Sequence, residues 1–253
     1  MAELSEVRVF SDAAELARAA AEAVAEAAGE TARHADRFTL ALSGGSTPEA
    51  TYRLLASREE PFRDRLPWSL IHFFWGDERH VPPDHPESNF RMASRAMLDA
   101  VPVPPGNIHP IPGEEPDAAR AAGEYEAELR SSFQLSRGEP PRFDLVLLGL
   151  GADGHTASLF PGTRAIHERE RLVVAHWVDK LGAFRITLTP PVFNAAARVI
   201  FLVSGETKAG ALRAVLRGDF EPDRVPAQIV RPVNGSLVWM VDRKAARDLA
   251  AAG

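Results

Sequence analysis

The most constraining feature of this sequence is an alternation of short apolar runs, rich in β-branched residues, with stretches of helical periodicity along all 253 residues. The runs that predict strands cover residues 37–45, 69–78, 142–151, 171–178, 184–190, 198–205 and the start of 236–250. The stretches that predict helices cover residues 11–29, 47–57, 88–100, 115–133, 206–216 and the end of 236–250. Such alternation is typical of α/β proteins, and uninterrupted apolar strands indicate a sheet covered on both faces. We therefore expect one domain over residues 1–253, with a doubly wound, mostly parallel sheet and helices on both faces.

Composition and charge limit the classes of partner and of chemistry that this chain can use. Its formal net charge of −6 gives no general attraction to nucleic acid or to an anionic membrane, so an anionic ligand needs local Arg, Lys or backbone N–H groups. The absence of cysteine excludes disulfides, thiolate catalysis and cysteine-based metal sites. The acidic segment 1–16 does not resemble a signal peptide, and no apolar run reaches the length that spans a bilayer. We expect a cytoplasmic protein without nucleic-acid or membrane partners.

A glycine-rich loop, GLGADGHTASLFPG at residues 149–162, follows one of the predicted strands. Gly149, Gly151 and Gly154 satisfy the spacing G-x-G-x-x-G of dinucleotide-binding turns. That interpretation needs a helix whose N-terminus faces the pyrophosphate, whereas a Pro-Gly pair ends any helix here after six residues. The spacing is therefore weak support for a dinucleotide. A turn with no role in ligand binding is a second interpretation.

The same loop carries an acid and an imidazole two residues apart. Asp153 and His155 are expected at the carboxyl end of a parallel strand, which is where open α/β sheets bind their ligands. A histidine can act as a general base near neutral pH, and a neighbouring carboxylate can orient it. A catalytic turn is thus a third interpretation of the loop.

The segment LSGGSTPEA at residues 42–50 predicts a strand end, a turn at Ser43, Gly44 and Gly45, and a helix with Pro48 at its first position. Consecutive backbone N–H groups at such a helix N-terminus can hold an anion, and the glycines allow its close approach. Because the Walker lysine is missing, a single phosphate group fits this loop better than a nucleoside triphosphate. A capped helix start without a ligand is the alternative.

Further polar residues follow or flank predicted strands. The segment GDERH at residues 76–80 places Arg79 beyond an apolar run, a composition that is also common in solvated loops. Arg185 and Lys208 each lie beside a strand end, where a basic side chain can meet a phosphate, although lone basic residues commonly lie on the solvated surface. The histidines do not show zinc-ligand spacing, so no metal site is expected.

Taken together, these segments resemble the 6-phosphogluconolactonase family. The stretches that carry the resemblance are LALSGGSTPEATYRLL, WGDERHVPPDHPESN, NIHPIPG, FDLVLLGLGADGHTASLFPGT, RITLTPPVFNAA and VSGETKA, which keep the family's order. The resemblance implies a glucosamine-6-phosphate deaminase/ribose-5-phosphate isomerase-like fold. It also implies hydrolysis of a sugar-phosphate lactone, 6-phospho-D-glucono-1,5-lactone, to 6-phosphogluconate in the oxidative pentose phosphate pathway, with no metal and no organic cofactor.

Motif by motif, the resemblance also implies roles for single residues. His155 matches the general base that activates a water molecule, and Asp153 matches the acid that orients or supports the imidazole. Ser43, Gly44 and Gly45 match the phosphate loop.

The same resemblance implies three basic substrate-binding residues. Arg185 and Lys208 match residues that hold the phosphate. Arg79 matches a substrate-facing arginine, which holds either the phosphate or the charge that develops on the carbonyl oxygen.

Three other functions stay open at the level of sequence. A glucosamine-6-phosphate deaminase-like isomerase is disfavoured because family deaminases continue the DGH loop with a Glu, whereas here no acid precedes Glu168. A non-catalytic sugar-phosphate sensor is expected to carry a DNA-binding module, and residues 1–37 show no basic helix-turn-helix pattern. The third is an inactive paralogue. Two further questions stay open: the oligomeric state, a monomer or a small homo-oligomer, and whether Asp77 and Glu78 touch the substrate or brace Arg79.

Overall fold

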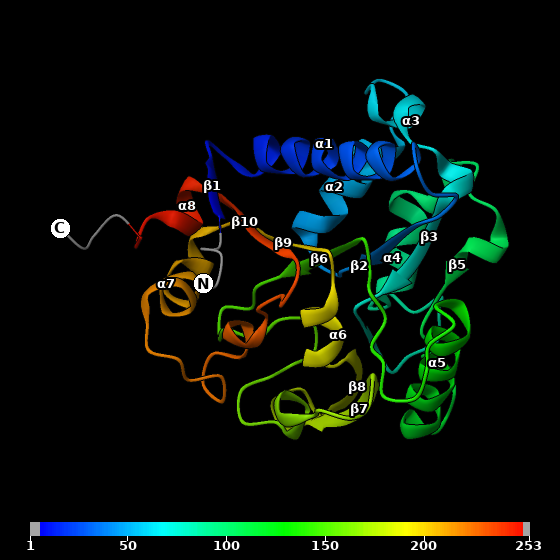
Figure 1. The fold of residues 1–253 in the computed structure, drawn as a ribbon. Helices are drawn as coiled ribbons and strands as arrows, with labels where there is room; N and C mark the ends of the chain where they lie inside the picture. The colour runs from blue at the N-terminus through cyan, green and yellow to red at the C-terminus, as the bar shows by residue number, and fades with distance from the viewer. Residues whose placement is uncertain (1–5, 250–253) are drawn as a thin grey trace.

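Seven parallel strands form the main sheet of the computed structural model, which describes residues 6–249 (Figure 1). All its neighbouring strands pair in parallel. In spatial order the strands are β1 (Glu6–Phe10), β10 (Ser236–Asp242), β9 (Arg198–Val203), β6 (Leu145–Gly149), β2 (Phe38–Leu42), β3 (Ile71–Trp75) and β5 (Ile108–His109).

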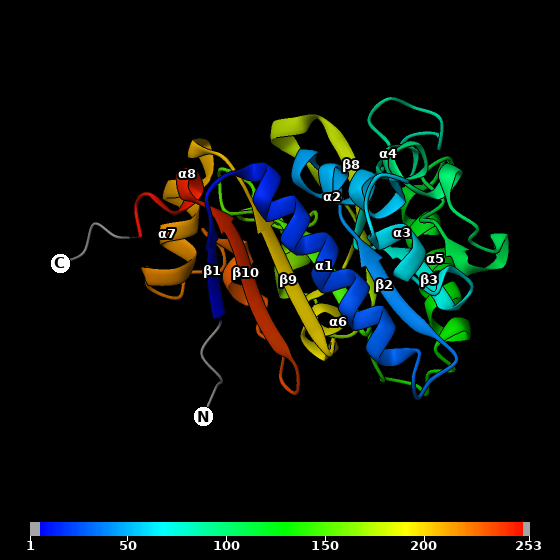
Figure 2. The ribbon, with the colours of Figure 1, turned by 90° about the horizontal axis from the view of Figure 1, so that it is seen from above.

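Helices cover both faces of this sheet. Helices α1 (Ala13–Thr31) and α2 (Ser46–Ala56) lie over one face, and Figure 2 shows α1 running across it between β9 and β2. Helices α5 (Ala118–Ser132) and α6 (Pro190–Ala195) lie on the opposite side in Figure 1. The other α-helices that the structure describes are α3 (Phe62–Arg65), α4 (Asn89–Ala96), α7 (Ala209–Arg217) and α8 (Arg243–Ala246).

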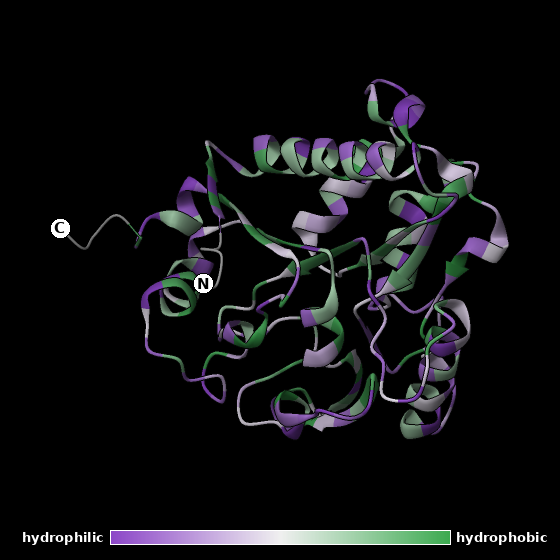
Figure 3. Ribbon diagram, viewed as in Figure 1, coloured by the Kyte–Doolittle hydropathy of each residue, from purple (hydrophilic) through white to green (hydrophobic). Residues whose placement is uncertain are grey.

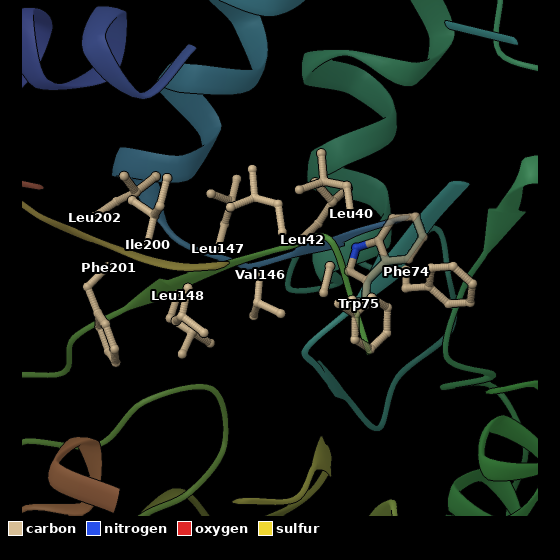
Figure 4. Close-up of a cluster of buried hydrophobic side chains, with 14 of the residues drawn as sticks. Leu40, Leu42, Phe74, Trp75, Val146, Leu147, Leu148, Ile200, Phe201 and Leu202 are labelled. Atoms are coloured by element: carbon tan, nitrogen blue, oxygen red, sulfur yellow. The ribbon is translucent and has the colours of Figure 1, made fainter. Parts of the chain in front are cut away.

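The core lies on both faces of the central strands. In Figure 4, Leu147 and Ile200 point to one face of the sheet, whereas Val146 and Phe201 point to the other. Each of these four side chains is at most 1% exposed. Because successive side chains of a strand alternate between faces, a strand that is apolar at every position needs cover on both sides. Figure 3 shows that hydrophilic positions are frequent on the helices and loops that surround the sheet.

A smaller antiparallel sheet lies beside the same face as α5. It contains β4 (Asp77–Arg79), β8 (Ala183–Leu188) and β7 (Val173–Val178), in that spatial order. Helix α5 packs against β7 and β8. Strand β4 follows β3 after Gly76 alone, so the chain passes directly from the main sheet to this second sheet.

The α/β fold with a mostly parallel sheet that the sequence predicts is confirmed. Strand β1, however, was not predicted from the sequence, because it lies at the sheet edge with Val7 and Val9 exposed at 39% and 54%, so no buried apolar run marks it. The predicted strands 171–178 and 184–190 exist as β7 and β8, but they belong to the antiparallel sheet.

The prediction of a single strand over residues 69–78 was wrong. Strand β3 ends at Trp75, and Gly76 then connects the two sheets. The Gly76 N–H donates to the Leu42 carbonyl at 2.9 Å, and the Gly76 carbonyl accepts from the Leu188 N–H at 2.9 Å. Helix α2 also begins at Ser46, two residues before the predicted first position at Pro48.

The chain changes direction between β2 and β6. From β2 it proceeds to β3 and β5 on one side, and it then returns to β6, β9 and β10 on the other. A crevice opens at the carboxyl ends of the strands where an α/β sheet reverses its strand order. The two glycine-rich loops predicted from the sequence follow β2 and β6, so both begin at this crevice.

Within residues 6–249, no helix is both long and apolar enough to cross a membrane. A single cluster of buried apolar side chains includes residues from Leu16 to Ala246. That residues 1–253 form one domain stays a prediction.

Candidate active site

A cleft of about 240 Å³ opens at the carboxyl ends of β9, β6, β2 and β3. Both glycine-rich loops contribute to its wall, together with residues that follow β3 and β9. The lining residues are Ser43, Gly44, Gly45, Ser46, Thr47, Pro48, Asp77, Arg79, Asn89, Gly149, Leu150, Gly151, His155, Ala157, Leu202, Val203, Ser204 and Lys208. The cleft therefore lies at the reversal of strand order, where the topology predicts a ligand site.

The N-terminus of α2 faces this cleft. Gly45 is the N-cap residue and offers no side chain to the first-turn N–H groups, while Ser46 and Thr47 line the cleft. Gly44 leaves the room that the Asn89 side chain occupies, because a Cβ atom on Gly44 would overlap Asn89 Oδ1. Uncapped N–H groups at the positive end of an 11-residue helix are suited to hold a phosphate.

The residue before these glycines is held by a buried tyrosine. The Tyr52 hydroxyl accepts from the Ser43 N–H and donates to the Ser43 carbonyl, each at 2.9 Å. Burial raises the pKa of the Tyr52 hydroxyl above its ordinary value, so it stays protonated. The loop therefore starts from a fixed backbone position.

The loop after β6 forms a tight turn around the acid–imidazole pair. The Gly151 N–H donates to the His155 carbonyl at 2.8 Å, and the Gly154 N–H donates to the Gly151 carbonyl at 3.0 Å. A Cβ atom on Gly151 would overlap the His155 ring, so only glycine fits this position. Ala157 has φ 46°, an uncommon conformation for a residue other than glycine, and it lines the cleft. The glycine spacing serves this turn.

His155 is held at its edge and at its face. Its Nδ1 atom lies 2.5 Å from Asp153 Oδ1. Its ring stacks on Phe160 with a centroid separation of 4.3 Å and an interplanar angle of 30°. Burial lowers the pKa of His155 to about 4, so the imidazole is neutral at physiological pH. With Nδ1–H donating to Asp153, the Nε2 lone pair is available to accept a proton.

Three cations surround this imidazole. After burial and the opposing effect of Asp77, the charges of Lys208, Arg185 and Arg79 further lower the pKa of His155. Arg79 and Arg185 are directly opposite each other in the β4–β8 ladder, and burial together with the Arg79 charge lowers the pKa of Arg185. Burial also lowers the pKa of Lys208.

The three cations have no ion-pair partner in the part of the chain that the structure describes. Among residues 6–249, neither Arg79, Arg185 nor Lys208 forms an ion pair with a carboxylate. Like charges held together at partly buried positions are costly unless a counter-anion binds. The cleft is therefore electrostatically suited to a small, highly charged anion.

The two acids that precede Arg79 have different surroundings. Glu78 accepts from the Arg79, Asn89 and Phe90 N–H groups at 2.8, 2.7 and 2.8 Å, so it caps α4 and fixes the backbone at Arg79. Asp77 lines the cleft, and its Oδ2 atom accepts from the Ser158 hydroxyl at 2.6 Å. Glu78 thus has a bracing position, whereas Asp77 faces the ligand site.

The structure brings most of the predicted site residues together. Ser43, Gly44, Gly45, Arg79, His155 and Lys208 line the cleft. Asp153 reaches the cleft through its contact with His155. Arg185 is not among the lining residues, and it approaches the site through its pairing with Arg79.

Sequence reasoning assigned no role to several residues of the site. Asn89 lies in the PESN stretch of the resemblance, and its buried Nδ2 atom donates to the Asp77 carbonyl at 2.9 Å. Ser204 follows β9 as Ser43 follows β2, so its place at a strand end was the available signal. Lys180, which contacts Asp153, carried no local signal, because its loop is remote in sequence.

Within the described residues, no three His, Asp or Glu side chains form a group that could hold a metal ion. That no metal or organic cofactor is needed stays a prediction. Fold and site together define an α/β protein whose cationic cleft is suited to a phosphorylated small molecule and contains a neutral imidazole.

Comparison with known proteins shows the family to which this chain belongs. A family model described as glucosamine-6-phosphate isomerases/6-phosphogluconolactonase matches residues 11–239. The 6-phosphogluconolactonase of Synechocystis is 47% identical over 211 residues, which cover 83% of this chain and 84% of that protein. The 6-phosphogluconolactonase of Homo sapiens is 42% identical over 246 residues, which cover 95% of this chain and 92% of that protein. The chain belongs to the glucosamine-6-phosphate isomerase/6-phosphogluconolactonase family.

Solved structures agree with this assignment. The 6-phosphogluconolactonase of Trypanosoma cruzi superimposes with a TM-score of 0.85 at 30% identity, covering 99% of both chains. A monomeric glucosamine-6-phosphate deaminase superimposes with a TM-score of 0.80 at 23% identity, covering 96% of this chain and 99% of that chain, a likeness that shows the fold alone. The predicted fold relation is thereby confirmed.

Proposed function

We propose that this chain is a 6-phosphogluconolactonase, which hydrolyses 6-phospho-D-glucono-1,5-lactone to 6-phosphogluconate by His155-assisted attack of water. The observation that carries the proposal is one cleft that combines an uncapped helix N-terminus with a neutral imidazole bound to Asp153. Relatives that are 42% and 47% identical over most of this chain bear that name.

The phosphate of the substrate is bound by the loop at Ser43, Gly44 and Gly45. The first-turn N–H groups of α2 donate to its oxygens, and the helix dipole favours its negative charge. Lys208, at the start of α7, lines the same cleft and supplies a partly desolvated cation. Binding of a phosphate dianion relieves the repulsion among the cations of the cleft.

Phosphate binding places the lactone carbonyl beside His155. Holding the reacting carbon against a bound water removes much of the entropic cost of a bimolecular encounter. The water oxygen then bonds to C1 of the lactone while His155 Nε2 takes its proton. The carbonyl electron pair moves onto the oxygen, which becomes an oxyanion. A positioned general base contributes about 10²–10⁴-fold to such a step.

The second half of the reaction breaks the ester bond. The oxyanion re-forms the carbonyl, the C1–O5 bond breaks, and the imidazolium returns its proton to O5. The products are the carboxyl group of 6-phosphogluconate and a free hydroxyl at C5. Arg79 and Arg185 stabilise the oxyanion or the phosphate, and their positive charge is present before the substrate binds. Asp153 stabilises the transient imidazolium.

The experiment is a rate measurement on freshly prepared 6-phosphogluconolactone, in which acid release is followed against the spontaneous rate. We expect His155→Ala to lose about 10²–10⁴-fold in kcat with the fold intact by circular dichroism. The matched control is His34→Ala, which removes an exposed imidazole from the segment between α1 and β2. Unchanged activity in His155→Ala would show that another group is the base.

A second substrate separates the related deaminase chemistry. Ammonia release from glucosamine 6-phosphate tests that activity directly, and the wild-type protein is expected to release none above background. Tight binding of 6-phosphogluconate without lactone hydrolysis would instead support a sensor. The cytoplasmic location stays a prediction.

A further inference from the structure

Lys180 lies in the connection between the two long strands of the small sheet. It belongs to the 3₁₀ turn Asp179–Leu181, which links β7 to β8 and ends at Gly182 in the left-handed conformation with φ 57°. The loop that carries Asp153 follows β6 in the main sheet. A contact between these two segments therefore joins the small sheet to the candidate catalytic turn.

Lys180 contacts both groups that hold the imidazole of His155. Its Nζ atom donates to Asp153 Oδ2, while Asp153 Oδ1 faces His155 Nδ1 at 2.5 Å and the His155 N–H at 3.2 Å. The same Nζ atom lies 4.6 Å from the ring centroid of Phe160, on which His155 stacks. The Lys180 ammonium group thus contacts both Asp153, which bonds the edge of the imidazole ring, and Phe160, which stacks on its face.

The Asp153 carboxylate depends on this lysine for its second oxygen. Among residues 6–249, Asp153 Oδ2 has no hydrogen-bond partner other than Lys180. A carboxylate held at one oxygen alone can rotate about its side-chain torsion, whereas a carboxylate held at both oxygens is fixed. Its orientation matters because the hydrogen bond at Nδ1 decides which ring nitrogen of His155 carries the proton.

We propose that Lys180 is a positioning residue for the lactonase reaction, which holds Asp153 so that His155 keeps its proton on Nδ1 and presents Nε2 to the attacking water. The inference rests on the proposed function of His155. The Lys180 side chain is 48% exposed, and an exposed ion pair contributes little to stability. Lys180 therefore acts on geometry with little effect on the folded state.

The test compares Lys180→Met, Lys180→Arg and a control, Lys244→Met. Lys180→Met is expected to lower kcat by roughly 10- to 100-fold, the cost of a misplaced reacting group, with KM changed by less than about twofold. Lys180→Arg keeps the charge and is expected to restore most of kcat. Lys244 is exposed on α8 and does not line the cleft, so its substitution by Met is expected to leave kcat unchanged.

A double-mutant cycle shows whether Lys180 acts through Asp153. In an Asp153→Asn background, Lys180→Met is expected to have no further effect, because the interaction is already lost. Additive losses, or a rise in KM with kcat unchanged, would overturn the proposal.

A spectroscopic readout separates this inference from the proposed function. The ¹⁵N shifts of the His155 ring, assigned by comparison with His155→Ala, report which nitrogen is protonated. We expect one Nδ1–H tautomer in the wild type and a mixture in Lys180→Met. The same single tautomer in both proteins would refute the positioning role even if the lactonase activity is as proposed. A wild type without lactonase activity would refute the proposed function while leaving this tautomer test interpretable.

Discussion

One phenol oxygen satisfies both backbone polar groups of Ser43, since Tyr52 Oη accepts from its N–H and donates to its carbonyl, each at 2.9 Å. The contact lies where β2 ends and the strand ladder no longer supplies partners. Tyr125 holds Trp75 at the end of the neighbouring strand β3 in the same way, at 2.9 and 3.0 Å. Buried hydroxyls thus fix the points from which two segments of the cleft wall begin.

Replacing Tyr52 by Phe is expected to weaken both stability and phosphate binding. The change leaves a buried N–H and a buried carbonyl without partners, which costs about 1–3 kcal/mol each before relaxation. We expect a lower free energy of unfolding by urea denaturation and a several-fold rise in KM. Tyr125→Phe is the comparison: it frees the start of the segment that carries Arg79, so we expect a similar loss of stability and a smaller rise in KM, because the backbone of the phosphate loop is unchanged. Equal KM effects in the two variants would contradict a specific role of Tyr52 in the phosphate loop.

Replacing Gly151 by Ala is expected to abolish most activity while the protein stays folded. The added Cβ would overlap the His155 ring and the Asp153 carboxylate, so the acid–imidazole pair has to move. A displacement of about 1 Å at a reacting group can cost about 10²-fold in rate. Kinetics on the lactone, with circular dichroism for the fold, measure this.

Gly29→Ala provides the comparison for that substitution. Gly29 lies within α1, and a Cβ there meets no atom within 4 Å. Ala is favoured over Gly in a helix by about 1 kcal/mol, so this variant is expected to be more stable and fully active. If both variants kept wild-type rates, the close approach at Gly151 would have no catalytic meaning.

The pH profile of kcat/KM is expected to have an unusually low acid limb. Burial lowers the pKa of His155 to about 4, so the free enzyme keeps a neutral imidazole from pH 8 down to about pH 5. Activity is expected to fall as the pH passes about 4, where the base becomes protonated. Initial rates in overlapping buffers, with the fold checked at each pH, measure this limb. A midpoint near 6.5 would mean that the cations and burial do not act on this imidazole.

The lowered pKa of His155 also makes the free energy of unfolding depend on pH. The folded pKa of His155 lies below its unfolded value of 6.5, so the unfolded chain binds the proton more tightly. This residue therefore lowers the free energy of unfolding as the pH falls from about 6.5 towards 4. His155→Ala is expected to flatten that part of the stability curve, which denaturant titrations at several pH values would show.

Replacing Glu78 by Gln is expected to destabilise the start of α4. The carboxylate accepts from three backbone N–H groups and from the Ser88 hydroxyl, whereas a Gln amide turns an NH₂ group towards one set of these donors. The expected loss is about 1–3 kcal/mol in the free energy of unfolding, measured by thermal or chemical denaturation. Glu59→Gln, at an exposed position, is the control. A loss no larger than that of the control would show that the cap contributes nothing.

The sequence predicted the parts of this protein that depend on local patterns. Central strands such as β2 and β6 are apolar at consecutive positions, so hydrophobic pattern alone marks them as strands of a doubly covered sheet. The turn glycines and the DGH motif are likewise local, which is why Gly151, Asp153 and His155 could be identified from their order in the chain. Edge strand β1 was not predicted, because its side chains are mostly exposed and therefore do not form an apolar run.

The sequence by itself determined the α/β class, the two glycine-rich loops and the residue types of the candidate site. Only the tertiary structure decided that these loops meet where the strand order reverses, between β2 and β6. It also decided that the chain enters a second sheet after Gly76 and that Lys180 contacts Asp153. The physical reason is that strand and turn patterns arise from contacts between near neighbours in sequence. Strand order and the pairing of distant polar groups arise from contacts across the sheet, which depend on how the whole core packs.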